Sequence, residues 1–425
     1  MNAHEIARQV LSGDFSQLPG EPTSWMGWMG HPERLRVLLE HLQGLNLRHR
    51  ENTVLVGMGG SSSGAGMLAH ELGCTTLTIL DTSHPDTIQG TNFKDVNLVV
   101  SSKSGGTVET VATMAYALSH GASARDLTVI TDAGTPLDEL GQSLSATVLY
   151  GDPRTGGRFS ALSVFGIAPA LIAGSLAIPS TVLSVEEWIE SFAHGAESAP
   201  PSGWGTTSVS GDPLTSFTAL WEEQLIAEST GKQGKGVLPA PGAPMEILDV
   251  VSHIQRSHAF TVGLCAALGV DAFTQPDVDA AKRRTFAELS VPTEDHFVEP
   301  EMLASWIDRG GPIVLQVYGP LARAEEVASL RAALSRKGHQ VSAGLGPRYL
   351  HSTGQIHKGG SAELRFLQIL VEPICEPERI SGRDYTFHDL ITAQARGDYQ
   401  ELLSRGRDVV RVKIAPGESL VALIH

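Results

Sequence analysis

Two glycine- and serine-rich segments follow short apolar runs and could bind an anion. The first spans residues 57–64 (GMGGSSSG) and follows residues 53–56, whereas the second spans residues 101–107 (SSKSGGT) and follows residues 97–100. Glycine lets backbone N–H groups approach a ligand closely, and hydroxyl groups add further donors. A phosphate monoester accepts many hydrogen bonds, so it suits two such loops on neighbouring strands. The candidate phosphate ligands are Gly60, Ser61, Ser102, Lys103, Ser104 and Thr107.

Other interpretations of these loops stay open. A tight connection between strand and helix, with no ligand, explains the first loop equally well when it is taken alone. A dinucleotide site would need GxGxxG and an acid about 20 residues later, and Asp81 could serve as that acid. The polar run at residues 61–63 and the similar second loop favour a phosphate monoester instead. Because the Walker pattern GxxxxGK[ST] is absent from the sequence, we do not expect hydrolysis of nucleoside triphosphates.

Strands that alternate with helices would place both loops at one edge of a parallel sheet. Apolar, β-rich runs at residues 53–56, 97–100 and 127–131 each precede a helical pattern, and similar runs occur at residues 313–318 and 364–371. Such alternation indicates parallel βαβ units. The sequence therefore predicts an α/β fold of two doubly wound parallel-sheet domains with helices on both faces.

Two further segments bear on the domain boundaries. Residues 195–203 are small, rich in proline and without periodicity, which is typical of a linker. Residues 409–414 alternate between apolar and polar side chains and predict an edge strand. The predicted units are an N-terminal helical segment (residues 1–44), a first α/β domain (45–194), a second α/β domain (205–375) and a C-terminal segment (376–425).

Composition narrows the class of protein. The 425 residues include 31 basic and 47 acidic side chains, which gives a net charge of −16, and 41% of the residues are hydrophobic. This is the composition of a folded globular chain, and its acidity disfavours a nucleic-acid surface. No apolar run reaches the roughly 18 residues of a membrane span, and the N-terminal residues lack the pattern of a secretory signal. Since the three cysteines are far apart, we expect a cytoplasmic protein without disulfides.

Six segments between residues 54 and 357 carry motifs of one known family. They read VGMGGS (56–61), SKSGGTVET (102–110), GGRFS (156–160), EQLIAESTGK (223–232), LGVDAFTQPDVDAAK (268–282) and LHSTGQ (350–355). Together they resemble the motifs of phosphoglucose isomerases, so this resemblance covers most of the chain. It implies that both α/β domains are of the sugar-isomerase type and that the substrate is a phosphorylated hexose.

The chain departs from the family pattern in two ways. The signature helix of the family usually begins Asn-Pro-Phe-Asp-Gln, whereas residues 271–275 read DAFTQ. The histidine segment comes after this helix in the sequence, although in common family members it comes before. That order resembles the isomerase part of fused transaldolase–phosphoglucose isomerases. It is compatible with one site only if the second domain is reconnected so that His351 still reaches it.

Interconversion of an aldose and a ketose needs a base that moves a proton between adjacent carbons, and a carboxylate can do this. Taken alone, Glu228 is interpreted as a solvated helix acid, as are Glu222 and Glu223. The flanking motif, by resemblance, makes Glu228 the expected base. Charge that builds up on the enediolate oxygens needs a fixed cation, and Arg158 in the GGRFS turn fits that role.

The remaining assignments depend on the resemblance. It assigns ring opening to His351, with Lys282 near the ring oxygen, while His357, six residues further on, stays an alternative. It also implies that Gln275 helps to bind the phosphate. Gln275 precedes Lys282 by seven residues, so we expect both to project from one helix face. We expect no metal and no other cofactor, since the reaction requires none and the sequence has no HxxxH or CxxC cluster.

The resemblance also implies a homodimer in which the partner subunit contributes His351 to the site. The leading hypothesis is an isomerase that interconverts glucose 6-phosphate and fructose 6-phosphate. The alternatives are a sensor that binds a phosphosugar without turnover and a dual phosphoglucose/phosphomannose isomerase. A nicotinamide-dependent dehydrogenase ranks last. We expect neither a nucleic acid nor a membrane as partner.

Overall fold

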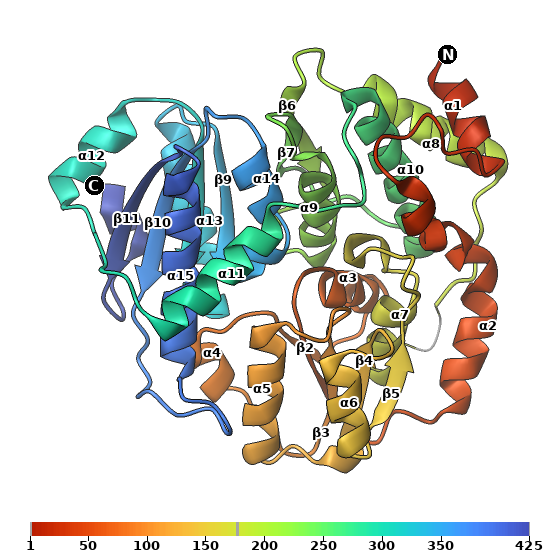
Figure 1. Ribbon diagram of the computed structural model, residues 1–425, viewed down its shortest axis with the longest axis horizontal. Coiled ribbons are helices and arrows are strands. Elements are labelled where there is room, and N and C mark those ends of the chain that lie inside the picture. Colours follow the sequence, from red (N-terminus) through yellow and green to blue (C-terminus); the bar gives the residue numbers. More distant parts are fainter. Residues whose placement is uncertain (1, 176–177, 425) are drawn as a thin grey trace.

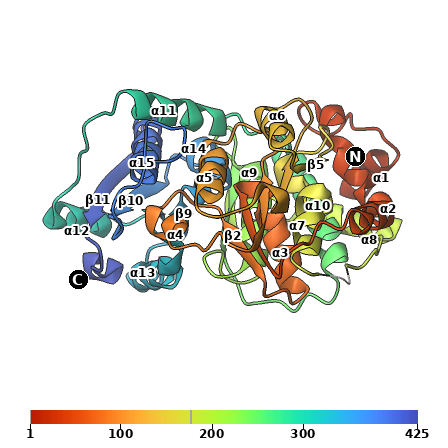
Figure 2. The same cartoon turned by 90° about the horizontal axis from the view of Figure 1, so that it is seen from below.

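Two parallel sheets occupy different regions of the chain in the computed structural model, which describes residues 2–175 and 178–424, without the side chains of residues 278–282 (Figure 1). The second sheet lies at one end of the molecule, and helices α1 (Ala3–Leu11) and α2 (His31–Gly44) lie at the other (Figure 2). In the described part of the chain, no helix combines the length and the apolar character that crossing a bilayer would require.

The first sheet has five parallel strands in the order β2-β1-β3-β4-β5. Its strands are β1 (Asn52–Gly57), β2 (Leu77–Leu80), β3 (Val96–Ser101), β4 (Leu127–Thr131) and β5 (Thr147–Tyr150). The helices α3 (Ser63–Glu71), α4 (Pro85–Gln89), α5 (Val108–Ser119) and α6 (Pro136–Ser143) connect the strands, and α7 (Val164–Ile172) follows the last one. Alternate residues of β1 belong to different cores: Leu55 packs with α3 and α7, whereas Val54 and Val56 pack with α5. Both faces are therefore covered, as predicted.

The second sheet has four parallel strands in the order β11-β10-β8-β9. Its strands are β8 (Ile313–Tyr318), β9 (Val341–Gly346), β10 (Arg365–Val371) and β11 (Asp408–Ile414). The neighbouring helices are α11 (Val278–Ser290), α12 (Pro300–Asp308), α13 (Ala324–Arg336), α14 (Gly354–Gly359) and α15 (Phe387–Ser404). Figure 2 shows α11 and α15 on one face of this sheet and α13 on the other. The prediction of an α/β fold with two doubly wound parallel sheets is confirmed.

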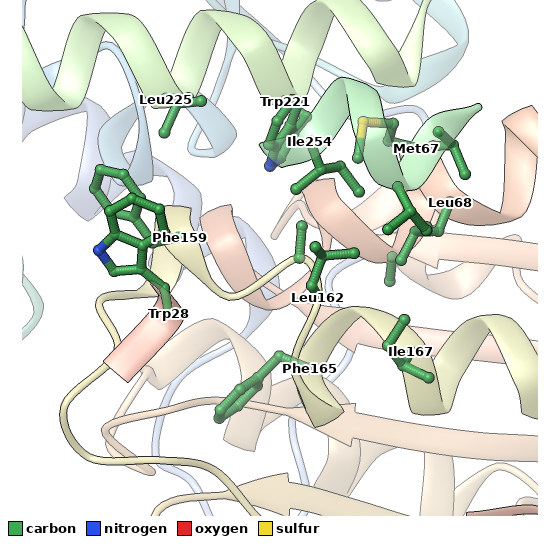
Figure 3. Packing of buried hydrophobic residues seen from close by; sticks show 14 of the residues in the cluster. Trp28, Met67, Leu68, Phe159, Leu162, Phe165, Ile167, Trp221, Leu225 and Ile254 are labelled. Carbon is green, nitrogen blue, oxygen red and sulfur yellow. The ribbon is translucent and has the colours of Figure 1, made fainter. Parts of the chain in front are cut away.

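Helix α9 (Phe217–Thr230) lies near the centre of the molecule, between α14 and α10 (Val250–Leu268) (Figure 1). Every residue from Thr218 to Thr230 is buried, because α3, α10, α14 and the strand β7 (Gly236–Pro241) pack around this helix. The strand β6 (Trp204–Val209) pairs with β7, and α8 (Val185–Glu197) packs on α10. Figure 3 shows the core between these helices and the first sheet, where Trp221 and Leu225 of α9 are buried.

The strand predicted at residues 409–414 is confirmed as β11, which pairs with β10 at the edge of the second sheet. This strand lies beyond residue 375, where the predicted second domain ends, so residues after that boundary contribute to the second sheet. The predicted domain boundaries themselves stay predictions.

Candidate active site

The first glycine-rich loop is in direct backbone contact with the turn that carries Arg158. A Cβ atom on Gly60 would lie 2.2 Å from the carbonyl carbon of Gly157, and one on Gly59 would lie 2.5 Å from the carbonyl oxygen of His351. Gly59 also has a φ of +56°, which favours glycine. Three segments far apart in the sequence therefore meet here: the loop after β1, the short helix Gly157–Phe159 and the short helix Arg348–His351.

Arg158 is buried and fully engaged by hydrogen bonds. Its Nε donates to Ser229 Oγ at 2.9 Å, and its Nη2 donates to the carbonyl oxygens of Ala272 at 2.8 Å and Thr274 at 3.1 Å. Its Nη1 lies 3.3 Å from Glu228 Oε1 and donates to Gln275 Oε1 at 3.0 Å. Because these bonds fix the guanidinium, its charge stays in place beside the Glu228 carboxylate.

Gln224 connects Glu228 to the first loop and to the histidine segment. Gln224 and Glu228 are four residues apart on α9, so they share one helix face. The Gln224 amide donates to Glu228 Oε2 and to the His351 carbonyl oxygen, both at 3.0 Å, and accepts from Ser63 Oγ at 2.8 Å. The predicted base and the predicted cation are thus connected to the backbone of the predicted ring-opening histidine.

The His351 side chain faces a carboxylate from the first domain. Its Nε2 lies 2.8 Å from Glu109 Oε1, at the beginning of α5. Gln394 of α15 donates to the same oxygen at 2.6 Å and accepts from Ser83 Oγ at 2.6 Å. A cavity next to this group is lined by Ser104, Gly106, Thr107, Val108, Glu109, Thr285, Phe286, Leu350, His351 and Gln394. Arg158 and Glu228 are not among these described lining residues; Gln224 joins them to His351.

The second glycine-rich loop forms the polar wall of this cavity. Ser104 and Thr107 line it, and Thr107 is the residue before the 12-residue helix α5. The free N–H groups at the start of a helix and the nearby hydroxyl groups can bind a phosphate. Ser102 is buried behind them, where its hydroxyl lies 2.9 Å from Thr107 Oγ1.

Lys103 of the second loop has a partner of opposite charge. Its ammonium group forms an ion pair with Asp132 of the loop after β4, and Lys103 is not among the described residues that line the cavity. This pair offsets the charge of Lys103, and a contact between Lys103 and phosphate stays a prediction.

The two histidine candidates have different surroundings. His357 is completely enclosed, packs on Tyr349 and Phe366, and lies 3.3 Å from Gln316 Nε2. Burial lowers the pKa of His357 well below its usual value, which leaves the ring neutral. Of the two, only His351 is among the described residues that line the cavity.

The expected placement of Gln275 and Lys282 on one helix face is wrong. Helix α11 begins at Val278, so Gln275 lies in the segment before it, where it accepts a hydrogen bond from Arg158. The Lys282 side chain lies outside the described residues. Gln275 is therefore placed at the buried arginine, and any contact with phosphate stays a prediction.

Glu222 and Glu223 are not solvated, because α9 is enclosed on all sides. Glu222 accepts from the backbone N–H of Ser210 at 2.6 Å and lies 2.8 Å from His253 Nε2. Burial raises the pKa of Glu223 to about 8. An acid that looks exposed in the sequence thus lies in the interior.

Lys232 is a second buried cation near Arg158. Its Nζ donates to the carbonyl oxygens of Ser229, at 2.7 Å, and Asp271. Burial and the neighbouring Arg158 charge lower the pKa of Lys232 to about 7. Lys232 and Arg158 together hold three backbone carbonyls of the segment 271–274, which fixes the chain beside Glu228.

Asp81 does not have the free carboxylate that a dinucleotide site requires. It is buried and accepts from Arg348 Nη2 at 2.8 Å. This ion pair joins the end of β2 to the short helix that carries His351. Asp81 therefore helps to join the two domains.

Glu109, Gln224 and Gln394 of this network were not assigned from the sequence. Glu109 and Gln224 lie inside the motifs at residues 102–110 and 223–232, and the four-residue spacing to Glu228 was a usable signal for Gln224. Gln394 lies 285 residues from its partner Glu109, and no local pattern announces that contact.

Within one chain the His351 carbonyl oxygen reaches Gln224 and the His351 ring faces Glu109, while the contribution of a histidine by a partner subunit stays a prediction. The reordered sequence places β9 and the following short helix directly against the first loop and α5. The second domain is thus reconnected in the way that the sequence order required.

This geometry defines an α/β protein with two glycine-rich loops, a buried carboxylate–arginine pair and a histidine–carboxylate pair. The chain is similar to glucose-6-phosphate isomerases. It is 27% identical over 271 residues to a probable glucose-6-phosphate isomerase of Haloarcula marismortui, covering 58% of each chain. It is 33% identical over 216 residues to a probable glucose-6-phosphate isomerase of Natronomonas pharaonis, covering 45% of this chain and 49% of that one. No family model matches the chain.

The chain matches less than two thirds of the length of these curated relatives. Among solved structures, a tagatose-6-phosphate ketose/aldose isomerase from Escherichia coli is 14% identical, with 95% of this chain and 92% of that chain covered and a TM-score of 0.37. The proposal that follows depends on the sequence relatives and on the site.

Proposed function

We propose that this chain interconverts D-glucose 6-phosphate and D-fructose 6-phosphate through an enediol intermediate. The observation that carries the proposal is the Glu228 carboxylate, held 3.3 Å from the buried Arg158 and linked through Gln224 to the His351 segment. A base, a fixed cation and an imidazole are the groups that an aldose–ketose isomerisation uses, and here the first two connect to the backbone of the residue that carries the third. The relatives named glucose-6-phosphate isomerase support the same reaction.

Each part of the site has a step in this proposal. Ser104, Thr107 and the start of α5 bind the phosphate, and His351 moves a proton between the anomeric hydroxyl and the ring oxygen to open the ring. The open chain then extends from the cavity toward Gln224 and the first loop. Glu228 removes the proton from C2 and returns it to C1, while Arg158 stabilises the charge on the enediolate oxygens.

Glu109 supports the histidine in this scheme. A carboxylate 2.8 Å from Nε2 favours the imidazole tautomer with its proton on Nε2, which leaves Nδ1 to exchange a proton with the sugar. The side chain of Lys282 is proposed to act near the ring oxygen, as the sequence motif implies. A homodimeric state, a cytoplasmic location and a role in glycolysis and gluconeogenesis complete the proposal, and the sequence resemblance supports them.

The decisive test compares the wild-type protein with Glu228→Gln. The substitution keeps the shape of the side chain but removes the base, so we expect kcat to fall by about 10³-fold while the phosphosugar still binds. Formation of glucose 6-phosphate from fructose 6-phosphate measures the rate, and calorimetry measures binding. Glu363→Gln, at an exposed position, is the matched control and should behave as wild type.

Other outcomes distinguish the alternatives. A wild-type protein that binds fructose 6-phosphate but does not isomerise it is a phosphosugar sensor. Turnover of mannose 6-phosphate in the same assay identifies a dual isomerase. Normal turnover by Glu228→Gln would contradict the assignment of the base.

A further inference from the structure

Helix α15 supplies a buried amide to the histidine–carboxylate pair. Gln394 lies on this helix and is 1% exposed. Its Nε2 donates to Glu109 Oε1 at 2.6 Å, and the same oxygen lies 2.8 Å from His351 Nε2. One carboxylate oxygen therefore serves two donors, one from the C-terminal helix and one from the ring-opening residue.

The orientation of the Gln394 amide is fixed from its other end. Ser83 Oγ donates to Gln394 Oε1 at 2.6 Å, which requires that the NH₂ group point at Glu109. Ser83 is 0% exposed and lies in the segment between β2 and α4. The backbone of Gln394 is held as well, since its carbonyl oxygen accepts from Tyr318 Oη at 3.3 Å. Ser83, Gln394, Glu109 and His351 thus form a continuous hydrogen-bonded chain that crosses between the domains.

We propose that Gln394 is a positioning residue for isomerisation, which orients Glu109 so that His351 presents its free ring nitrogen to the sugar. This inference rests on the proposed function, because it assigns a role in ring opening. Gln394 lines the cavity, but its amide is committed to Glu109 and Ser83. It acts through the carboxylate, and the segment after residue 375 thereby contributes to the chemistry.

Gln394 reduces the effective negative charge of the Glu109 carboxylate. A hydrogen bond donated to a carboxylate stabilises its ionised form and reduces the negative charge that the neighbouring imidazole experiences. Titratable groups that face this position include His351 from the helix after β9, Tyr318 from β8 and Tyr385 from the segment before α15. Burial raises the pKa of both Tyr318 and Tyr385, so these phenols stay neutral.

Two substitutions distinguish the effect of the Gln394 hydrogen bond from the effect of side-chain size. Gln394→Met retains the length of the side chain but removes the donor, so we expect kcat to fall about tenfold while KM for fructose 6-phosphate changes less than about twofold. The acid limb of the kcat/KM profile should move to higher pH, because Glu109 loses one hydrogen bond and its charge then acts more strongly on His351. Gln394→Glu adds a second carboxylate and should move that limb further in the same direction.

Gln400→Met, a half-buried position on the same helix, is the matched control and should retain wild-type kcat and pH profile. Thermal melting checks that each variant is folded. Ser83→Ala, which releases the far end of the amide, should move the profile in the same direction as Gln394→Met but by less.

A readout without turnover separates this inference from the proposed function. The pH titration of the His351 ring, followed by NMR and assigned by its loss in His351→Gln, should shift upward in Gln394→Met whether or not the protein isomerises sugars. An unchanged titration together with an unchanged kcat in a folded Gln394→Met protein would overturn the positioning role. A shifted titration in a protein without isomerase activity would retain the role of Gln394 and reject the isomerase.

Discussion

Gly60 and Gly157 touch through their backbones, and there is no room for a side chain on Gly60. The nearest atoms to a Cβ at this position would be the carbonyl carbon and oxygen of Gly157, both at 2.2 Å. Backbone atoms cannot rotate out of the way, unlike the end of a flexible side chain. The contact therefore sets how closely the first glycine-rich loop approaches the turn that carries Arg158.

Gly60→Ala should separate these two segments. We expect a loss of about 1–3 kcal/mol in the free energy of unfolding and a fall of about 100-fold in kcat/KM, because Arg158 and the loop would no longer be in register. Chemical denaturation and the isomerase assay measure the two effects. Gly44→Ala, at the end of α2 with nothing within 4 Å of its added Cβ, is the control and should retain activity. Equal behaviour of the two variants would show that the contact is dispensable.

Stability should depend on pH through Glu223. Burial raises the pKa of this carboxyl from 4.5 to about 8, so the folded protein holds a proton that the unfolded chain releases between these values. The free energy of unfolding therefore falls as the pH rises from about 4.5 to 8. Glu223→Gln stays neutral and should remove this fall. Its free energy of unfolding relative to wild type should therefore be on the order of a few kcal/mol higher at pH 8 than at pH 5.

Denaturation curves at pH 5, 6, 7 and 8 test this dependence. Glu190→Gln, whose side chain is 73% exposed on α8, is the control and should follow wild type at each pH. Parallel curves for Glu223→Gln and wild type would mean that Glu223 is ionised in the folded protein.

The site should not be shared between subunits. In a dimer with shared sites, mixing Glu228→Gln with His351→Gln and allowing the subunits to exchange would restore roughly a quarter of the sites. Here Glu228 is connected to the His351 backbone within one chain. If the same chain also supplies the ring, every site in a mixed dimer would lack one of the two side chains. We expect no activity above that of the separate variants.

The complementation experiment needs proof that subunits have exchanged, which mass measurement of differently tagged chains provides. A mixture of wild type with Glu228→Gln serves as the reference and should lose activity in proportion to dilution. If the mixture of inactive variants recovers activity, the site is shared between subunits, as the sequence resemblance implied.

Sequence patterns located the strands that consist of continuous apolar residues. The runs at residues 127–131 and 313–318 are β4 and β8 with the same bounds. Strand β7, which reads GVLPAP, and strand β9, which reads VSAGLG, were not predicted, because proline and glycine interrupt the apolar pattern. Tertiary contacts rather than local preference determine these strands.

Site residues within short sequence motifs could be predicted, whereas contacts between residues far apart in the sequence could not. Arg158 and Glu228 lie in short motifs, and the structure brings them to 3.3 Å. The pairing of Lys103 with Asp132 depends on a neighbouring strand, and the burial of Glu223 depends on four elements around α9. Neither the ion pair nor the burial can be predicted from adjacent residues in the sequence.

The position of β11 at the edge of the second sheet has a consequence for biosynthesis. A chain that emerges from the ribosome in order can complete the first sheet once Tyr150 is free, because all five of its strands are then available. The second sheet must wait for Ile414, and α15 with Gln394 is released only shortly before. The first sheet can therefore form well before the second domain docks beside it, and the contact between Glu109 and Gln394 is made only after that late docking.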